Sequence, residues 1–452
     1  MYLEDTLSYV NTWILSPICS MTLLLCGMIL SIRLKFFQFT NPVKLWRIMK
    51  MKSKGGTSPF RAVTVALAGT LGVGNISGVA VALSLGGAGA IFWMWISAFL
   101  AMIVKYSEIV LAVYHREKSN GEIHGGAMYY IKKGINKKGL ASIIATFFAL
   151  FCIFSSLTTG SIIQINAAAE AAYASFRTPP IIIGIIIALL SAVSLFGKKA
   201  SKISEITVRL VPAMTLIFIC LSLTVIFTNI KQIPNIFTLI IRGAFSQNSA
   251  IGGILGYIFS KGVRFGVTKG LFSNEAGCGT STIAHAQANN TSPSAQGVWG
   301  IFEVFFDTIV LCTMTAFVLL LNYSDSVPDV GGGVTITLSA YTTQLGPIAN
   351  TVLSISIILF AFATILCWAY YGCECVRFIT KRKYAIDVYL IIYLLSIIYG
   401  ASAPSSLVWE IADLSICVMM SINTICICQM SETVVKLSEK KKVKQIASPS
   451  FL

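Results

Sequence analysis

A stretch of 43 residues without a single charge runs from position 62 to position 104, and it strongly constrains the fold of this chain. A helix needs about 20 apolar residues to cross the hydrocarbon core of a bilayer, so this stretch is too long for a single crossing. We divide it at the glycine-rich turn 86–89, where glycines favour a reversal of the chain. The region therefore predicts two consecutive membrane-spanning helices.

Composition extends this conclusion to the whole chain. Of the 452 residues, 56% are hydrophobic and 12% are charged, whereas soluble domains carry about 25% charged residues. A water-soluble protein of several domains is therefore excluded, and the chain has room for about ten to twelve spanning helices. We predict an all-α polytopic membrane protein in which residues 1–452 form a single transmembrane transporter domain.

Eleven spans can be drawn along the sequence by following the charge-poor stretches. The first is preceded by Glu4 and Asp5 and not by a basic segment, so we expect a spanning helix there and not a signal peptide. The predicted spans are 13–33, 62–86, 90–114, 142–168, 179–197, 208–229, 252–288, 297–321, 348–375, 385–401 and 406–430.

The positions of Lys and Arg predict the orientation, because cytoplasmic loops hold the excess of positive charge. With the N-terminus outside, 27 of the 34 Lys and Arg fall in inner segments, and only Arg177, Lys231 and Arg242 fall in outer loops. We expect a multi-pass protein of the plasma membrane with a cytoplasmic C-terminus. The basic tail 431–452 would lie near anionic lipid, and the short basic clusters do not form a nucleic-acid-binding face.

Two of the predicted spans are interrupted by glycines. The second contains GTLGVGNISG at 69–78, and the seventh contains GLFSNEAGCGT at 270–280. The two are five spans apart, and an odd number of spans reverses the direction of the chain. The pattern therefore predicts an inverted-topology repeat, with 62–229 as repeat one, 252–430 as repeat two and 13–33 as an extra helix.

An interrupted helix exposes backbone groups that lipid cannot satisfy, so it persists where it lines a cavity or binds a solute. Free N–H groups at half-helix N-termini suit a carboxylate, and free carbonyls suit a sodium ion or an ammonium group. A zwitterion bound together with sodium would satisfy both the free N–H groups and the free carbonyls. The alternative is that the glycines only allow helices to pack closely, and we favour this interpretation for Gly78 and Gly86.

At these two segments the chain resembles the alanine or glycine:cation symporter family of sodium-coupled amino-acid transporters. Further segments that resemble the family lie at 89–116, 125–131, 301–316 and 360–372, so the resemblance extends over nearly the whole chain. It implies a LeuT-type 5+5 inverted repeat in which the first helix of each repeat is discontinuous. It also implies sodium-driven uptake of alanine or glycine without chemical conversion.

The resemblance implies a substrate site between the two interrupted helices and spans four and nine. Gln164 would face the substrate, with a bridge between two helices as the alternative. Trp368 would be a wall that limits the size of the substrate side chain, with simple packing as the alternative. The implied substrate-binding residues are Thr70, Gly72, Gly74, Asn75, Gln164, Asn274, Gly277, Gly279, Thr280 and Trp368.

Sodium is the coupling ion that the resemblance implies, and no other cofactor is expected. Its ligands would be the hydroxyl of Thr364 with hydroxyl or carbonyl oxygens of Thr70 and Val73; the alternative for Thr364 is a hydroxyl bonded to its own helix. The family commonly has Thr where Val73 stands and Ser where Ala363 stands. The missing hydroxyls leave both the ion stoichiometry and the choice between sodium and proton open.

Two pairs of charged residues lie inside predicted spans at helical spacing, namely Lys105 with Glu108 and Glu303 with Asp307. Charge within the bilayer is costly and is functional by default. We favour pairing across helices for all four residues. The alternative is a proton relay through Glu303 or Asp307.

The remaining acidic, histidine and cysteine residues show no arrangement typical of an enzyme. Glu275 lies near Lys269 in sequence, so we expect pairing at a helix end or gating there. His285 would cap or line the inner pathway, whereas His115 and His124 would be solvated. The cysteines are expected to pack as small buried side chains. No set of residues has metal-ligand or nucleophile–base spacing.

Taken with the resemblance, these features predict a sodium-coupled symporter that takes up small neutral amino acids by alternating access. The alternatives are a proton-coupled amino-acid symporter and an amino-acid-sensing membrane receptor. A channel is disfavoured because paired helix breaks suit an occluded site. The sequence does not show which of alanine, glycine and serine is preferred, or whether D-amino acids are accepted as well as L-amino acids. It also leaves the ion stoichiometry and the oligomeric state open.

Overall fold

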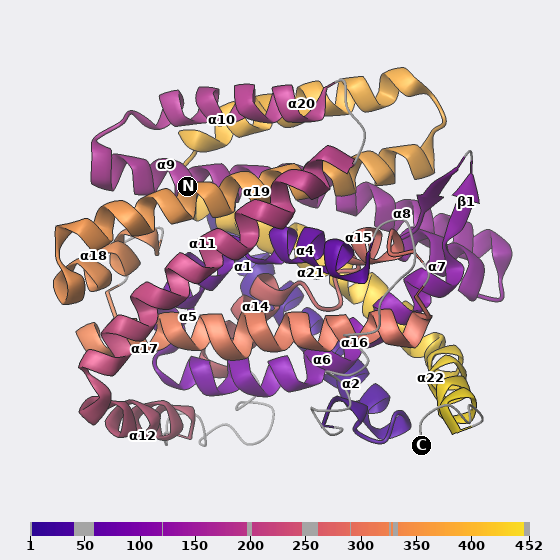
Figure 1. Ribbon diagram of the computed structural model, residues 1–452, viewed down its shortest axis with the longest axis horizontal. Coiled ribbons are helices and arrows are strands. Elements are labelled where there is room, and N and C mark those ends of the chain that lie inside the picture. Colours follow the sequence, from indigo (N-terminus) through magenta and orange to yellow (C-terminus); the bar gives the residue numbers. More distant parts are fainter. Residues whose placement is uncertain are drawn as a thin grey trace.

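The computed structural model describes residues 2–39, 58–119, 121–196, 201–245, 261–289, 291–324, 327–328 and 333–446. Position 197 of the predicted fifth span, positions 252–260 of the seventh and positions 447–452 of the tail lie outside the described residues. Almost all of the described chain is helical (Figure 1). A predicted loop also contains an antiparallel hairpin, β1 (Glu117–Ser119) paired with β2 (Glu122–His124).

The helices agree in order with the predicted spans, and short 3-10 or π segments (η) interrupt several of them. The first part of the chain contains α1 (Tyr2–Val10), η1 (Asn11–Leu15), α2 (Ser16–Arg33), η2 (Phe37–Phe39), α4 (Pro59–Thr70), η3 (Val73–Asn75), α5 (Ser77–Gly86), α6 (Gly89–His115), α7 (Ala127–Gly134), α8 (Lys138–Leu157), η4 (Thr158–Ile162), α9 (Ile163–Phe176), α10 (Pro180–Leu195), α11 (Ser201–Thr228), η5 (Ile230–Gln232) and α12 (Ile233–Ala244). The second part contains α14 (Lys261–Asn274), α15 (Thr282–Ala286), α16 (Pro293–Val304), η7 (Phe305–Cys312), α17 (Thr313–Tyr323), α18 (Val334–Leu345), α19 (Pro347–Ile379), α20 (Lys383–Ala401), α21 (Ser405–Gln429) and α22 (Ser431–Ile446).

Eight helices of the described chain are long and apolar enough to cross a bilayer. The pair α4 and α5, bent by 58° at the first predicted break, would make a ninth. The two remaining predicted spans fall on α10, which has 16 residues, and on the short helices α14 and α15. The chain is therefore an all-helical membrane protein apart from its small hairpin, while the number eleven stays a prediction.

The N-terminal helix begins earlier than the predicted boundary at residue 13, because α1, η1 and α2 continue one another from Tyr2 to Arg33. The polar residue Asn11 does not end it. Asn11 is buried, and its side-chain amide donates to the backbone carbonyl of Glu410 in α21 at 2.7 Å and to the Glu410 carboxylate at 2.5 Å. These two bonds of the amide nitrogen connect the N-terminal helix to α21.

The two interrupted helices lie side by side at the centre of the bundle and run in opposite directions (Figure 1). A Cβ atom built on Gly74 would lie 3.2 Å from Cα of Ser273, and one built on Gly86 would lie 3.3 Å from the carbonyl oxygen of Lys261. The second contact supports the packing interpretation of Gly86. Among the described residues, a Cβ at Gly78 would meet no atom within 4 Å, so the packing interpretation of Gly78 is wrong there.

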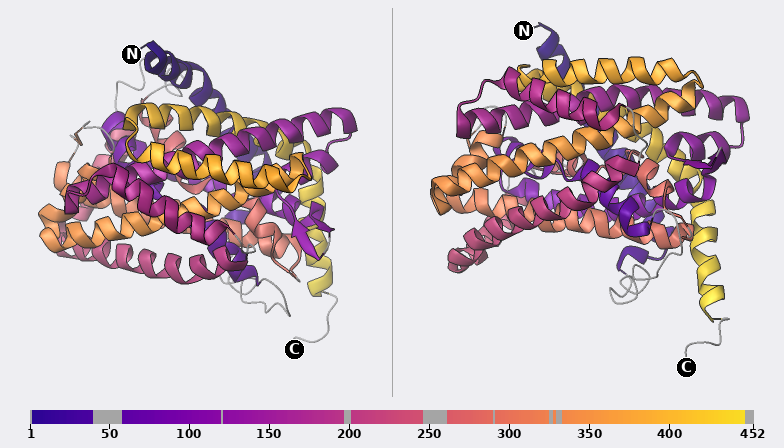
Figure 2. Two further views of the ribbon diagram at one scale, coloured as in Figure 1. Left: turned by 90° about the horizontal axis from the view of Figure 1, so that it is seen from above. Right: turned by 45° about the horizontal axis from the view of Figure 1, so that its top comes forward.

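The outer helices of the bundle expose apolar side chains, as lipid contact requires. In α10, Leu189 and Val193 are 63% and 79% exposed, and Leu395 of α20 is 59% exposed. These two helices lie together at the upper edge of Figure 1. The N-terminal helix and α22 project from opposite sides of the molecule in both views of Figure 2.

Candidate functional site

The first helix break joins three helices through Gly72. A Cβ atom there would lie 2.8 Å from Gln164 Oε1 and 3.0 Å from Thr364 Oγ1, so a larger residue would displace both side chains. The Val73 N–H donates to Gln164 Oε1 at 3.2 Å, and the Thr364 hydroxyl donates to the carbonyl of Ala68 at 2.9 Å. Thr364 thus bonds a neighbouring helix and not its own. The structure brings Gly72, Val73, Gln164 and Thr364 together.

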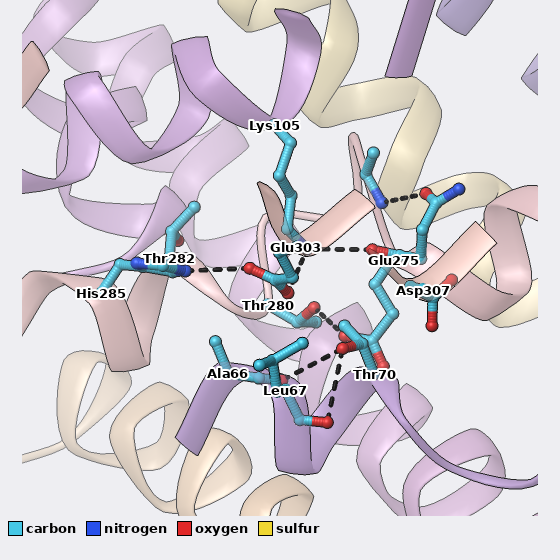
Figure 3. A network of polar contacts seen from close by, with 12 residues as sticks. Ala66, Leu67, Thr70, Lys105, Glu275, Thr280, Thr282, His285, Glu303 and Asp307 are labelled. Carbon is cyan, nitrogen blue, oxygen red and sulfur yellow. Dashed lines mark hydrogen bonds and ion pairs between the residues drawn. The ribbon is translucent and has the colours of Figure 1, made fainter. Parts of the chain in front are cut away.

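The Thr70 hydroxyl bonds back within its own helix. It donates weakly to the carbonyls of Ala66 and Leu67, at 3.4 and 3.5 Å (Figure 3). The Thr70 carbonyl accepts the Gly72 N–H at 2.8 Å. A helical threonine commonly bonds back by one turn in this way. The hydroxyl that the resemblance assigns to substrate or sodium is therefore engaged within α4.

The second break is held by a carboxylate. Glu275, Gly277 and Gly279 have φ values of +52°, +81° and +76°, the left-handed region that few residues other than glycine adopt. The Glu275 carboxylate accepts hydrogen bonds from Thr280 Oγ1 at 2.6 Å and from Trp368 Nε1 at 3.1 Å (Figure 3 labels Glu275 and Thr280). These bonds compensate an unfavourable backbone conformation and link the break to α19.

Trp368 packs directly on the backbone of a π-helical segment. A Cβ atom at Gly160, in η4, would lie only 2.3 Å from Cβ of Trp368. The indole is fully buried. Gly160 therefore allows the ring to lie between η4 and the second break, close to Glu275.

Gly277 and Gly279 face away from the first break. The Gly277 carbonyl accepts from Asn423 Nδ2 at 2.8 Å, and the Gly279 N–H donates to Glu108 Oε2 at 3.2 Å. Both partners lie on α21 and α6, on which no substrate-binding residue is predicted. These two glycines therefore shape the break, and the structure does not bring them to Gln164.

We expect Gly277→Val to destabilise the fold strongly. Its φ is left-handed, and a Cβ there would lie 2.9 Å from Thr424 Cγ2 and 3.0 Å from Leu23 Cδ1. Backbone strain alone should cost about 1–3 kcal/mol. The control is Gly78→Ala, which adds a Cβ within α5 where no atom lies within 4 Å. Thermal unfolding in detergent should show a large fall in the melting temperature for Gly277→Val only; equal melting temperatures would contradict this role.

A buried carboxylate, Asp307, lies between the two breaks and is absent from the site predicted from sequence. It accepts hydrogen bonds from Asn75 Nδ2 at 2.7 Å, Ser273 Oγ at 2.8 Å and Thr308 Oγ1 at 2.9 Å. Asn274 Nδ2 donates in turn to Thr308 Oγ1 at 3.0 Å. Asn75 from the first break and Asn274 from the second thus meet around one carboxylate.

Every donor to Asp307 is neutral, and no ion pair of the described residues includes this carboxylate. The prediction that it pairs across helices is therefore wrong. A buried carboxylate without a cation is costly, and it favours the binding of a cation or a proton. Asp307 also lies in the π-helical segment η7, and π-bulges are frequent at functional sites. The sequence signal was its charge within a span.

Of the other charges predicted to pair, Lys105 and Glu303 do so. Glu108 does not: it is in no ion pair of the described residues and accepts from the Gly279 N–H and from Asn423 Nδ2, both at 3.2 Å, so its predicted pairing is wrong. Lys105 Nζ lies 3.1 Å from Glu303 Oε1 and donates to the Asn274 carbonyl at 3.0 Å. His285 Nε2 lies 3.0 Å from Glu303 Oε2, and Gln296 Nε2 lies 2.9 Å from His285 Nδ1 (Figure 3 shows Lys105, Glu303 and His285). The predicted pairing is confirmed for Lys105 and Glu303. Because Lys105 binds the C-terminal carbonyl of α14, it also anchors the second break.

Two further expectations need correction. Glu275 does not pair with Lys269, whose ammonium instead contacts Asp413 of α21 at 2.7 Å. His124 is not simply solvated, because its Nδ1 lies 3.1 Å from a carboxylate oxygen of Glu374 in α19. The hydrogen bond to Glu374 raises the pKa of His124 above its ordinary value. The hairpin thereby attaches to the C-terminal part of α19.

Comparison of the sequence with known proteins identifies one family and relatives that are described as sodium symporters. The sodium:alanine symporter family matches residues 1–450. A sodium/alanine symporter, AgcS, of Methanococcus maripaludis is 36% identical over 445 residues, which are 97% of this chain and 96% of that protein. A probable sodium/glutamine symporter, GlnT, of Bacillus subtilis is 34% identical, over 96% of this chain and 89% of that protein.

Comparison with solved structures identifies the same kind of fold. MhsT, crystallised with L-phenylalanine, aligns with a TM-score of 0.53 at 15% identity, over 86% of this chain and 100% of that one. The manganese transporter of Eremococcus coleocola aligns with a TM-score of 0.55 at 12% identity, over 90% of this chain and 88% of that one. Both are transporters of the LeuT-type fold. At these identities the likeness concerns the fold alone.

Proposed function

Because the chain belongs to the sodium:alanine symporter family, we propose that it is a sodium-coupled symporter of small neutral amino acids. The observation that carries this proposal is Asp307, a buried carboxylate that binds neutral donors from both helix breaks. A transporter that couples two gradients needs a cation site whose occupancy affects both broken helices. Asp307 is the charged group in that position.

The coupling ion is proposed to bind at Asp307. The Asn75 side-chain oxygen beside it is buried and has no hydrogen-bond partner among the described residues. A carboxylate and an amide oxygen are hard oxygen ligands that suit small hard cations. Sodium there would neutralise Asp307 and connect Asn75 of the first break with Ser273 of the second. The Thr364 hydroxyl and the Ala68 carbonyl form a second oxygen pair, at the position that the family resemblance assigns to sodium.

The substrate is proposed to bind between Gly72 and Gln164, which meet at the first break, and Trp368, which bonds Glu275 at the second. The breaks free N–H groups that suit its carboxylate and carbonyls that suit its ammonium group. The buried indole of Trp368 leaves little room for a long side chain, which favours alanine, glycine or serine. The remaining predicted residues at the breaks, Gly74 and Thr280, would shape this site through backbone packing and the bond to Glu275.

Alternating access follows from the antiparallel pair of broken helices. We propose that 62–229 and 252–430 form an inverted repeat and that the helices around it rock to open the site to each side in turn. The N-terminus would be outside and the C-terminus cytoplasmic, as the charge count predicts. Each sodium entering a cell at a potential of about 100 mV would then contribute about 2.3 kcal/mol to accumulation.

The proposal is tested by radiolabelled L-alanine uptake into proteoliposomes at constant pH. We expect accumulation with an inward sodium gradient and none when choline replaces sodium. Uptake that ignores sodium and follows an acidic outside would replace this proposal by proton-coupled symport, with Asp307 as the proton carrier. Binding of alanine without accumulation under either gradient would instead favour a receptor.

We expect Thr364→Ala to raise the half-saturating sodium concentration for alanine uptake by about tenfold, the effect of losing one hydrogen bond or ligand of about 1.4 kcal/mol. The reason is that the variant removes the hydroxyl that faces Ala68 and Gly72. Thr364→Ser keeps the hydroxyl and should stay within about twofold of the original protein. Sodium titrations of uptake give both values, and an unchanged sodium dependence in Thr364→Ala would exclude Thr364 as a ligand.

A further inference from the structure

A polar cavity of about 370 Å³ lies outside the paired breaks. Residues of the N-terminal helix, including Asn11 and Thr12, line it together with the beginnings of α14 and α21. Small-molecule sites typically begin at about 300 Å³, so the volume suits a small solute. None of the predicted substrate-binding residues lines this cavity, which is therefore separate from the site at the breaks.

The cavity carries opposite charges on two elements. α14 contributes Lys261 and Arg264, and α21 contributes Glu410 and Asp413. Lys269 of α14 and Asp413 form an ion pair at 2.7 Å. Neither Lys261 nor Arg264 has a carboxylate oxygen within 4.0 Å in the part of the chain that the structure describes. Two cations on one wall therefore have no carboxylate partner among the described residues. The other wall carries Glu410, whose carboxylate accepts from Asn11 Nδ2, and Asp413, which pairs with Lys269.

The cavity also lies on the line of the second broken helix. Lys261, at its rim, is exposed, whereas Lys269 is 3% exposed. From Lys269 to Asn274 the helix rises by about 7.5 Å, at about 1.5 Å per residue. The end of the cavity at Lys269 and Asp413 therefore lies within two helical turns of the second break, whereas Arg264 lies about 15 Å from it along the helix.

We propose that this outer pocket binds the transported amino acid as a zwitterion before it reaches the paired breaks. Arg264 and Lys261 receive its carboxylate, and Glu410 with Asp413 receives its ammonium group. An inorganic anion or an amine would leave one wall without a partner of opposite charge. The inference rests on the proposed function for the identity of the solute, and with the N-terminus outside the pocket faces the outer solution.

Site-directed labelling tests the pocket independently of transport. Thr12→Cys places a thiol on the lining, and a water-soluble methanethiosulfonate reagent modifies it at a rate followed by peptide mass spectrometry. L-Alanine at ten times its half-protecting concentration should slow labelling about tenfold. The same protection is expected when Asn274→Ala disables the central site. Protection that disappears in the Asn274→Ala background would overturn the proposal, because it would then reflect central binding.

Three comparisons complete the test. L-Lactate, which has the carboxylate but no ammonium group, should protect much less than alanine, and equal protection would overturn the zwitterion assignment. Arg264→Gln should raise the half-protecting alanine concentration about tenfold, whereas Arg242→Gln, an exposed arginine of α12, should not. Sodium-driven uptake without any protection of Thr12→Cys by alanine would contradict the outer binding site and leave the proposed function intact. Protection without uptake in either gradient would support the outer binding site and contradict the proposed function.

Discussion

Asp307→Ala is expected to abolish sodium-driven alanine accumulation. The carboxylate is fully buried, receives three neutral side-chain donors and lies where residues from both breaks meet. A contact between a buried carboxylate and a cation contributes about 1.5–3 kcal/mol, which corresponds to a loss of sodium affinity of about ten- to a hundredfold. Uptake should therefore fall to background at physiological sodium concentrations. Initial uptake rates in proteoliposomes over a wide range of sodium concentrations measure this effect.

Asp307→Asn and Glu170→Gln are the controls for this result. Asparagine keeps the size of the side chain but not its charge, so it should preserve folding and still lose sodium dependence. Glu170 of α9 binds the backbone N–H and hydroxyl of Thr335 and is not one of the groups that contact Asp307, so Glu170→Gln should keep sodium-driven uptake. Normal sodium dependence in Asp307→Asn would contradict the assignment of Asp307 as the cation site.

Lys105→Met is expected to destabilise the protein more than the loss of any exposed ion pair. The side chains of Lys105 and Glu303 are both 0% exposed. Methionine has a similar length but leaves the Glu303 carboxylate without its cation and the Asn274 carbonyl without a donor. Breaking a buried pair from one side typically costs about 3–5 kcal/mol. The melting temperature in detergent should fall sharply, and little folded protein should reach the membrane.

The double variant Lys105→Met with Glu303→Gln separates charge from packing. It removes the uncompensated carboxylate, so it should recover much of the melting temperature lost in the single variant. Lys436→Met breaks the exposed pair with Glu432 in α22 and should leave the melting temperature nearly unchanged. A double variant as unstable as Lys105→Met would show that neutralising Glu303 is not the main role of Lys105.

The sequence predicts the fold well where a signal depends on local composition. Uncharged runs identify nearly every spanning helix, and the glycine clusters at 69–78 and 270–280 identify both breaks. At the second break Gly277 and Gly279 adopt left-handed φ values, whereas at the first Gly72 leaves the space that Gln164 and Thr364 occupy. It does not predict α12 or α18 in the long loops. In α12, buried Ile236 and Ile240 recur every four residues, a helical pattern in a segment too short to cross a bilayer.

The site is less predictable, because the partner of a buried polar group depends on tertiary packing. Glu303 and Asp307 are four residues apart and look alike in sequence, yet one pairs with Lys105 and the other receives only neutral donors. Likewise, the Thr364 hydroxyl crosses to α4, whereas that of Thr70 turns back on its own helix. The π-helical segments η4 and η7, which position Gly160 and Asp307, have no periodicity that sequence analysis detects.

Alanine-driven entry of radioactive sodium tests the central claim most directly. Proteoliposomes would hold equal sodium concentrations on both sides at constant pH, and external L-alanine would be the only gradient. The account predicts that sodium accumulates transiently inside with the original protein and not with Asp307→Asn. Alanine entry without movement of sodium would contradict sodium coupling, and sodium accumulation in Asp307→Asn would remove the coupling site from Asp307.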